Sequence, residues 1–416
     1  MLPSAVNNSM RELTKQLGAF SDGTDGIDVL NLHDDDASAS IKIQAPSAVT
    51  TTTTLTLPDG DGDAGAMLQT NGSGQLAWST AYRNRNLIIN GACVIDQRNS
   101  GSSVTPADTN YTIDRWRYTA SQASKFTFQQ NAGSVTPPAG FENYMGFTVA
   151  SAVTVGSSDY FAITQRIEGY NVNQLEFGTA NAKTVTLSFW VRSSLTGTFG
   201  GSLRGANFGR SYPFTYSISS ANAWEYKTVT VAGDTSGTYQ SGSTTGLEVI
   251  FGLGAGSTYS GSAGAWTASG HFSATGAVSV VGTGSATWYV TGIQLEVGEQ
   301  ATPFEHWSYG EELALCQRYY QTMARGAMGG AYSSTQWIGG GNFNTPMRAT
   351  PTASQPSGVA TVHDPSTATF AQSSTNITAT YASTTGSTFI LGNLSGMTAY
   401  RPMSLFGGQI DFSAEL

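Results

Sequence analysis

The 416-residue sequence predicts an all-β protein with a short N-terminal helix, and three observations lead to that prediction. Charged residues make up only 11% of the chain, against about 25% in an ordinary soluble domain, so the amphipathic helices of an α/β enzyme are not encoded. Aromatic residues reach 11%, which a disordered chain would lack. Thr, Val, Tyr, Phe and Trp favour strands, and the 49 glycines, with abundant Ser, favour the turns between them.

The composition also excludes several kinds of partner. The net charge of −9 argues against nucleic-acid binding, which needs a basic stripe for the phosphates. No run of about 18 apolar residues occurs, so we expect no membrane insertion, and the N-terminus lacks a secretory pattern. A chain with the composition of an extracellular or particle surface and no export signal is expected to be released by lysis. Cys93 and Cys316 lie far apart in sequence and are expected to be buried small hydrophobes rather than a disulfide.

Residues 1–20 are predicted to form a short helix. Pro3 and Ser4 are typical of a helix start, and an apolar stripe with heptad-like spacing follows. The stripe consists of Val6, Met10, Leu13, Leu17 and Phe20. A helix this short is marginal alone, so we expect it to anchor on a partner or to bundle with other copies. Packing on its own chain is the alternative.

Residues 21–81 are predicted to form a β stem. Short strand-like pieces lie at 27–32 and 41–44, and a Thr-rich run leads into TLTLPDGDGDAGAMLQTNGSGQLAW. In that stretch Asn71-Gly72 is a strong hairpin turn. These pieces hold too little apolar surface to bury in a monomer, so we expect several copies to share one thin core.

Residues 82–308 are predicted to form a β-sandwich, because many short strands alternate with Gly/Ser-rich loops. The segment 184–192 alternates with period 2, which places Trp190 and Arg192 on the face away from the core. The residues predicted to face the core are Val185, Leu187, Phe189 and Val191.

A second alternating strand is predicted at 287–297. Strict alternation divides its side chains between two faces. One face carries Tyr289, Ile293, Leu295 and Val297. The other face carries Trp288, Gln294 and Glu296.

A linking helix is predicted over 309–325, with Leu313, Cys316 and Tyr320 on one face. Residues 326–416 are predicted to form a C-terminal β domain. Its prolines, which cannot donate to a strand ladder, indicate edge or boundary positions. They are Pro346, Pro351 and Pro356.

Several of these segments resemble known proteins. The stem stretch TLTLPDGDGDAGAMLQTNGSGQLAW and the opening LPSAVNNSMRELTKQL look like parts of tailed-bacteriophage tail fibres. The blocks NRNLIINGACVIDQRNSG, YTIDRWRY and TWYVTGIQLEVGEQATPFEHWSYGEELALCQRYYQT resemble a jelly-roll module common in phage tail and fibre proteins, which is related to carbohydrate-binding jelly rolls. NFNTPMRATPT and RPMSLFGGQIDFSAEL resemble the segments that follow this jelly roll in phage fibres.

The resemblance implies a homotrimeric tail fibre or receptor-binding protein. Such a protein would be made in the bacterial host cytoplasm and would act on the virion. Its N-terminal region would bind phage tail or baseplate proteins, and its other end would bind a host cell-surface glycan or protein. Three weak sites on one particle would give avidity.

No catalytic motif is present, so no enzyme activity, cofactor or metal is predicted. The sequence has no Gly-x-Ser-x-Gly elbow, no His-Glu-x-x-His and no Walker loop, and none of its four histidines has metal-ligand spacing. Glu296 and Glu299 are paired carboxylates of the kind that glycosidases use, but local structural roles are favoured. The acidic turn 59–63 has half the pattern of a calcium loop, yet Thr70 occupies the position that needs a bidentate Glu.

Aromatic side chains are the candidates for binding, because sugar faces are flat and partly apolar and stack on Trp and Tyr. The first candidate set lies on the outer faces of two predicted strands: Trp190, Arg192, Trp288, Gln294 and Glu296. The second set lies in the C-terminal loops: Tyr332, Trp337, Tyr381 and Tyr400. Packing against a loop or a neighbouring subunit is the alternative for each aromatic residue.

The sequence therefore predicts a phage tail fibre that attaches the virion to its host without breaking a bond. A purely structural virion component, such as a fibre spacer, baseplate-linked protein or head fibre, is the alternative, since a fold does not imply a function. A glycan-degrading tailspike is a further alternative, although no fixed-period repeat of a β-helix is present.

Overall fold

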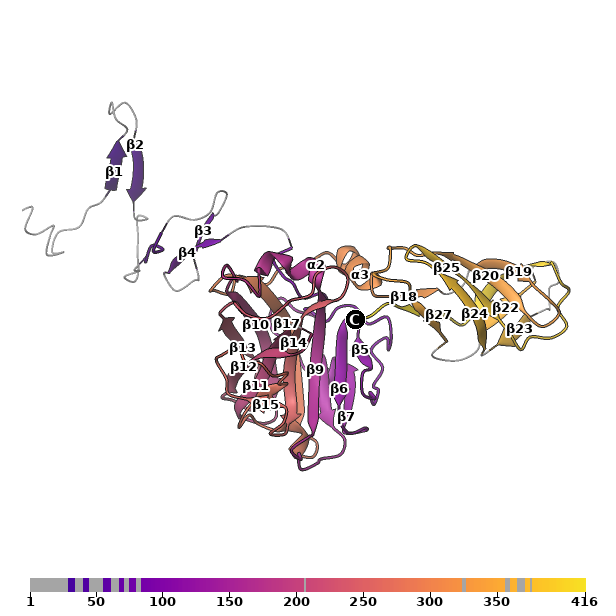
Figure 1. Ribbon diagram of the computed structural model, residues 1–416, viewed down its shortest axis with the longest axis horizontal. Coiled ribbons are helices and arrows are strands. Elements are labelled where there is room, and N and C mark those ends of the chain that lie inside the picture. The colour runs from indigo at the N-terminus through magenta and orange to yellow at the C-terminus, as the bar shows by residue number, and fades with distance from the viewer. Residues whose placement is uncertain are drawn as a thin grey trace, which may run out of the picture. The chain divides into compact units, whose positions relative to one another are not determined.

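The computed structural model describes residues 29–33, 40–44, 55–60, 67–70, 75–79, 84–205, 207–323, 327–355, 360–364, 371–374 and 376–416. The chain divides into two compact units, Met1–Trp78 and Ser79–Leu416. Strands predominate, which confirms the all-β prediction (Figure 1). The predicted N-terminal helix over 1–20 lies outside the described residues. No helix in the described ranges is long and apolar enough to cross a membrane.

The described residues of the first unit form two small sheets. Strand β1 (Val29–His33) pairs antiparallel with β2 (Ser40–Gln44), and β3 (Met67–Thr70) pairs with β4 (Leu76–Ser79). Four apolar side chains described here are at least two-fifths exposed in the single chain, and Leu76 is half-buried. The four are Leu55, Leu57, Leu68 and Trp78. That several copies share one thin core in this segment stays a prediction.

The second unit begins with a jelly roll built from two antiparallel sheets. In both sheets, many neighbouring strands are not consecutive in the sequence. The five-stranded sheet has the order β13 (Glu225–Val231), β10 (Val185–Ser193), β17 (Thr287–Val297), β8 (Met145–Val149), β7 (Phe126–Gln130). The six-stranded sheet has the order β12 (Arg210–Ile218), β11 (Gly197–Gly205), β14 (Thr245–Ala255), β9 (Tyr160–Glu168), β6 (Trp116–Ala120), β5 (Tyr111–Ile113). Short elements connect them: η1 (Ala132–Ser134), α2 (Gly169–Val172), η2 (Asn173–Leu175), β15 (Ser260–Gly261), β16 (Ser273–Ala274) and η3 (Val280–Gly282).

Aromatic side chains fill the space between the two sheets. Phe189 of β10 and Phe251 of β14 have ring centroids 5.0 Å apart, and Trp288 of β17 lies 5.4 Å from Phe251. The four apolar residues of β10 that were predicted to face the core are all buried in it, so the predicted alternation of that strand is confirmed. Cys93 and Cys316 are free and buried, as expected.

The prediction for β17 was wrong at Trp288, and the reason is a β-bulge. The register against β10 shifts between Ser188 and Trp190, opposite Gly292, whose φ of +62° suits glycine. The extra residue reverses the alternation, so Trp288 faces the core together with Ile293 and Leu295. Tyr289, predicted on the core side, faces outward instead.

The predicted linking helix is shorter than 309–325. Helix α3 (Tyr309–Gln317) begins with a capping box between Ser308 and Glu311, and it ends at Gln317. The next residues form strand β18 (Tyr320–Met323), so Tyr320 lies on a strand rather than on the helix.

The C-terminal β domain contains two sheets. The three-stranded sheet has the order β18, β27 (Ile410–Ser413), β21 (Thr352–Ser354). The seven-stranded sheet has the order β23 (Ala371–Ser374), β22 (Ala360–His363), β26 (Pro402–Gly407), β19 (Met328–Ala331), β20 (Trp337–Asn342), β25 (Gly386–Leu391), β24 (Ile377–Ala382). Its separate core is built around Trp337, Phe389 and Phe412.

Ion pairs join the C-terminal domain to the jelly roll. The carboxylate of Glu415 pairs with Arg115 and, at 2.7 Å, with Arg98, both on the jelly roll. Arg318, directly after α3, pairs with Glu168 of β9 at 2.8 Å. Asp114 and Arg115 lie at the corner between β5 and β6 and have separate partners. Asp114 accepts hydrogen bonds from Gln97, and Arg115 pairs with Glu415.

Candidate functional site

The strongest candidate site is a group of aromatic side chains on the outer face of the five-stranded sheet. Alternation along β10 directs Trp190 and Arg192 outward, as predicted, and alternation along the edge strand β13 directs Tyr226 outward. Trp190 stands opposite Tyr226 in the register of the two strands. Their ring centroids are 5.3 Å apart with an interplanar angle of 49°. The two rings therefore form one continuous apolar surface on the sheet.

A second set of aromatic rings lies on the same face. Tyr289, turned outward by the bulge, lies 5.3 Å from Tyr144, which lies 5.4 Å from Trp224. The guanidinium of Arg192 lies 5.4 Å from the Tyr289 ring, and its Nε donates to the carbonyl of Asn222. Tyr144 and Tyr289 are buried and act as a floor, whereas Trp224 is half-buried.

Three further rings cluster beside the bulge. Phe141 and Phe304 lie 5.1 Å apart, and His306 lies 4.8 Å from Phe304. A Cβ at Gly292 would come within 2.6 Å of the Phe141 ring, so glycine is needed both for its φ and for this close packing. His306 is exposed, and the two phenylalanines are half-buried.

The chemistry of this outer face suits a neutral polar ligand. The Tyr226 side chain is 43% exposed, Trp190 is half-buried, and Thr228 and Thr230 of the same edge strand are exposed. Burial raises the pKa of Tyr226, so its phenol stays protonated and can donate a hydrogen bond. Aromatic faces beside hydroxyl groups are the combination that sugar rings bind.

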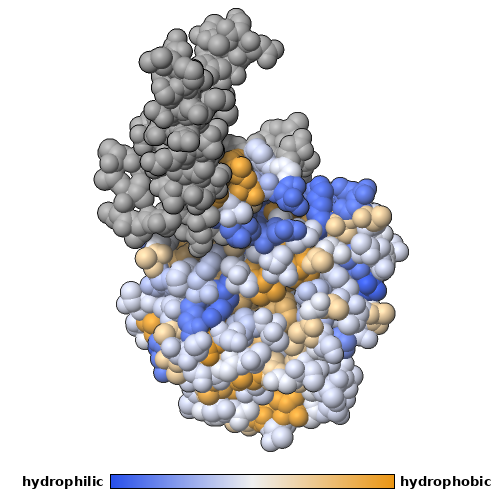
Figure 2. Space-filling view, turned by 90° about the vertical axis from the view of Figure 1, so that its left-hand side faces the viewer, coloured by the Kyte–Doolittle hydropathy of each residue, from blue (hydrophilic) through white to orange (hydrophobic). Residues whose placement is uncertain are grey.

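The surface around these strands is weakly polar. Figure 2 shows the molecule from the side that lies at the left of Figure 1, where β10 to β13 are found. Apolar patches alternate there with weakly polar surface, and strongly hydrophilic residues form only a few groups. This appearance follows from the low share of charged residues in the chain.

The other jelly-roll residues predicted as ligand contacts have structural roles. Trp288 is fully buried, and its Nε1 donates to the hydroxyl of Tyr216 at 3.0 Å. Gln294 and Glu296 point outward as predicted, but both are buried under the segment that follows β17. Glu296 accepts hydrogen bonds from the backbone and hydroxyl of Thr302, and Gln294 donates to Glu296. Their side chains hold that segment on the sheet.

The C-terminal candidates separate into one core residue and three exposed ones. Trp337 is fully buried beside Phe389, with ring centroids 5.6 Å apart, so it is a core residue. Tyr332, Tyr381 and Tyr400 are 57%, 66% and 89% exposed. No ring contact joins these three tyrosines, all of which the structure describes. They present single rings rather than one surface.

Sequence reasoning missed the partner of Trp190. Tyr226 was not among the predicted binding residues. Alternation from Glu225 to Val231 would have placed Tyr226 and the two threonines outward, since Val229 and Val231 are the apolar members. Tyr289 carried no such signal, because its orientation depends on the bulge at Gly292.

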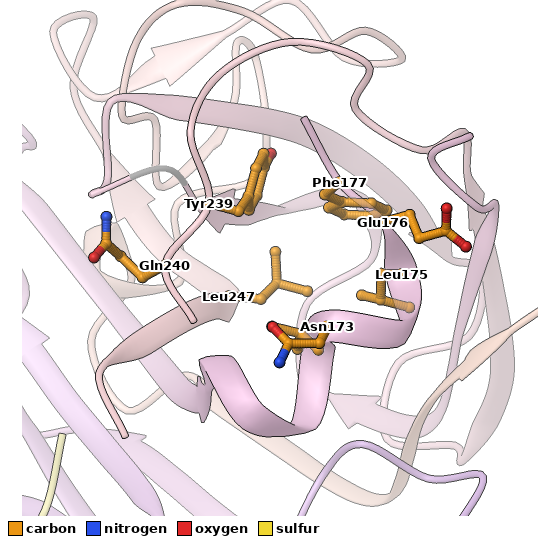
Figure 3. Close-up of a pocket in the computed structure, with 8 residues that line it drawn as sticks. Asn173, Leu175, Glu176, Phe177, Tyr239, Gln240 and Leu247 are labelled. Carbon is orange, nitrogen blue, oxygen red and sulfur yellow. The ribbon is translucent and has the colours of Figure 1, made fainter. Parts of the chain in front are cut away.

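A small cavity lies elsewhere in the jelly roll, near α2 and η2. Its volume is about 100 Å³, and its apolar walls come mainly from Leu175, Phe177 and Leu247. In Figure 3 the polar ends of Glu176 and Gln240 point away from Leu247 at the periphery. Ligand sites usually measure roughly 300–1,000 Å³, so this cavity is too small to hold a glycan segment.

The described residues contain no group of three or more His, Cys, Asp or Glu side chains that could hold a metal ion. Glu296, the carboxylate considered for acid–base chemistry, has both oxygens engaged by Thr302.

Comparison with known proteins returned solved structures only. No protein-family model and no curated protein matches the chain. One structural match is the enzymatically active domain of tailspike protein 4 from bacteriophage CBA120, at 12% identity and a TM-score of 0.29. The match covers 51% of this chain and 22% of that one, so the chain spans about a fifth of the tailspike domain.

Other matches are carbohydrate-binding modules. The family 11 module of the Clostridium thermocellum cellulase Lic26A-Cel5E is 13% identical with a TM-score of 0.25, covering 49% of this chain and 98% of the module. The N-terminal cellulose-binding domain of Cellulomonas fimi β-1,4-glucanase C is 12% identical with a TM-score of 0.20, covering 48% and 100%. Likenesses at this level do not assign a ligand, an activity or a partner to the chain.

Proposed function

We propose that this chain is a tail fibre or receptor-binding protein of a tailed bacteriophage, and that the outer face of its five-stranded sheet binds a glycan of the host cell surface. The fibre is a homotrimer on the virion and joins the tail or baseplate through its N-terminal region. Binding attaches the particle without cleaving the glycan. The fibre-like and jelly-roll-like sequence blocks support this assignment.

The observation that carries the glycan-binding proposal is the Trp190–Tyr226 pair. Two rings 5.3 Å apart lie on an edge strand and its neighbour, open to solvent and flanked by the hydroxyls of Thr228 and Thr230. A core position would have buried both rings, yet Tyr226 is 43% exposed. Each ring offers a face to a sugar, and three copies of a weak site give avidity on a particle.

The test is a glycan-array measurement with the full chain and with Trp190→Ala and Tyr226→Ala. Tyr332→Ala and Tyr400→Ala are the matched controls, because they remove exposed rings from the C-terminal domain. We expect the two jelly-roll variants to bind host glycans at least tenfold more weakly, which is about 1.4 kcal/mol, and the controls to bind normally. Loss of glycan binding in the two control variants alone would show that the site lies on the C-terminal domain.

The alternative is a purely structural virion component. In that case the aromatic rings serve only to pack the loops over the sheet, as the contact of Tyr144 with Trp224 already does. The full chain would then bind neither host cells nor any glycan on the array. Release of sugar fragments from host polysaccharide would instead support a tailspike enzyme.

A further inference from the structure

The opposite face of the jelly roll carries a row of charged side chains. On the outer side of the six-stranded sheet, Glu248 of β14 stands between Arg204 of β11 and Arg166 of β9. Arg204 pairs with Glu248 at 2.5 Å, and Arg166 pairs with it at 3.3 Å. The carboxylate is 1% exposed, whereas the Arg166 side chain is 21% exposed. One buried carboxylate is therefore shared by two arginines.

A third arginine lies on the next strand. Arg117 of β6 points outward, because its neighbours Trp116 and Tyr118 belong to the core, and it stands opposite Thr164 of β9. Within the part of the chain that the structure describes, the Arg117 side chain makes no ion pair. Burial and the nearby charge of Arg166 lower the pKa of Arg117. Its charge is therefore desolvated without a partner, which is unfavourable unless a ligand compensates it.

The acidic groups near Arg117 do not satisfy it. Glu248 is engaged by the other two arginines. Asp108 also acts on Arg117 electrostatically, but its Oδ1 accepts hydrogen bonds from Thr119 and from the backbone of Ala120. Three guanidinium groups thus face two carboxylates, in a chain whose net charge is −9.

Two further features indicate that this face is built to receive a group. The Oγ1 of Thr164, fully buried between Arg117 on β6 and Ile250 on β14, has no hydrogen-bond partner. The ring of Phe208 lies 4.8 Å from the guanidinium carbons of both Arg166 and Arg204. Stacking covers the face of a planar guanidinium and leaves its edge for hydrogen bonds. Part of that edge already donates to Glu248, through Nε and Nη2 of Arg204 and Nε of Arg166, so a ligand would take the remaining N–H groups.

We propose that Arg117, Arg166 and Arg204, with Thr164, bind an anionic group, a carboxylate or a phosphate carried by a cell-surface polymer. The proposal rests on the proposed function only for the source of the anion. Planar guanidinium groups bind both kinds of oxyanion through paired N–H donors. The receptor is accordingly an acidic polymer, and the protein holds it at a place distinct from the Trp190–Tyr226 surface.

The test titrates the full-length protein by calorimetry with three probes. An oligogalacturonate represents the carboxylate source, a polyglycerol phosphate represents the phosphate source, and a neutral oligosaccharide of equal length is the control. We expect at least one acidic probe to bind, with an affinity that falls as salt is raised, because the contacts are charged. Binding of the carboxylate probe, the phosphate probe or both supports the site and identifies the source. Binding of neither, or equal binding of the neutral probe, overturns it.

The variants locate the binding on this face. Arg117→Gln and Arg166→Gln are each expected to lower the affinity for the acidic probe at least tenfold. Lys183→Gln is the matched control, because it removes one positive charge from an exposed pair with Glu176 elsewhere on the jelly roll. Equal losses in Arg117→Gln and Lys183→Gln would show that only overall charge matters and would overturn the site.

Folding is monitored separately. Arg117→Gln removes a partly buried charge without a partner, so its thermal unfolding temperature should not fall below that of the parent protein. Trp190→Ala should leave the acidic probe bound. If the protein binds no glycan on the array but binds the acidic probe, only the proposed Trp190–Tyr226 site is contradicted. If it binds a glycan but neither acidic probe, only the proposed arginine site is contradicted.

Discussion

The two β domains of the second unit differ in how they use their aromatic residues. The jelly roll buries many of its rings between two broad sheets, in one large cluster that includes Trp116, Phe189, Phe251 and Trp288. The C-terminal domain has a smaller cluster around Trp337 and leaves Tyr332, Tyr381, Tyr400 and Phe406 exposed. A large core stabilises a scaffold on which surface residues can vary, whereas a thin core leaves less stability in reserve.

The largest expected effect tests this difference with a matched pair of core substitutions. Trp288→Ala and Trp337→Ala each remove a fully buried indole, and each should cost about 3–5 kcal/mol of unfolding free energy. Because the C-terminal core is smaller, the same cost should unfold that domain, while the jelly roll retains its fold.

Hydrogen exchange resolved along the chain measures the outcome. Trp337→Ala should abolish protection of β19, β20, β25 and β26 and leave β9, β10 and β14 protected. Trp288→Ala should lower protection in the jelly roll without abolishing it. Equal and complete loss of protection in both domains with either variant would show that they fold as one cooperative unit. It would contradict the expectation that the smaller core makes the C-terminal domain less stable.

The second effect concerns the junction between the domains. Arg115 is 1% exposed, pairs with Glu415 and stacks 3.5 Å from the ring of Tyr319. Glu415→Gln would leave this buried guanidinium without its counter-charge, so we expect a loss of about 3 kcal/mol. Glu176→Gln breaks an exposed pair with Lys183 and should cost less than about 1 kcal/mol.

Chemical denaturation of the two variants gives the values. A Glu415→Gln loss as small as that of Glu176→Gln would mean that the ion pair does not hold the domains together. The C-terminal domain would then be joined to the jelly roll mainly by the α3 region, where Arg318 pairs with Glu168.

The sequence predicted the regular parts of this fold and missed those set by distant pairing. The alternation of β10 is uninterrupted, so its core and outer residues follow directly from the pattern. In β17 a single glycine reverses the faces, and a glycine in a strand is compatible with a bulge or with none. The apolar residues after Gln317 fit a helix, but β18 is a strand because it pairs with β27, which lies about 90 residues later in the chain.

The candidate site was predictable to the same extent. Trp190 and Arg192 follow from the alternation of β10, and the exposure of Tyr332, Tyr381 and Tyr400 fits their loop or edge positions. The sequence alone could not show that Trp288 and Trp337 are buried rather than on the surface. Core packing and sugar binding both favour tryptophan, so the residue type does not distinguish them. The arginine face gave no local signal, since its three arginines come from three strands that meet only in the folded sheet.

The smallest of the three effects is a pH dependence at the same junction. Asp114 is buried and accepts two hydrogen bonds from Gln97, whose side chain also donates to the carbonyl of Tyr320 in the C-terminal domain. Burial raises the pKa of Asp114 to about 6, against 3.8 for an ordinary Asp. The folded state therefore binds this proton more tightly than the unfolded state does.

The sign of the effect follows from the order in which the two states titrate. Below about pH 4 both states are protonated; as the pH rises toward 6 the unfolded chain loses the proton first, so the Asp114 contribution to stability falls by on the order of 2 kcal/mol. Glu248 and Asp234, whose pKa values are lowered by Arg204 and Arg210, contribute in the opposite direction.

The measurement is accordingly a difference between the parent protein and Asp114→Asn, by denaturation at several pH values. We expect the stability of Asp114→Asn relative to the parent to rise between about pH 4 and about pH 6. A constant difference would show that Asp114 is ionised throughout, held by Arg98 on the jelly-roll side, and that the junction is polar rather than dry.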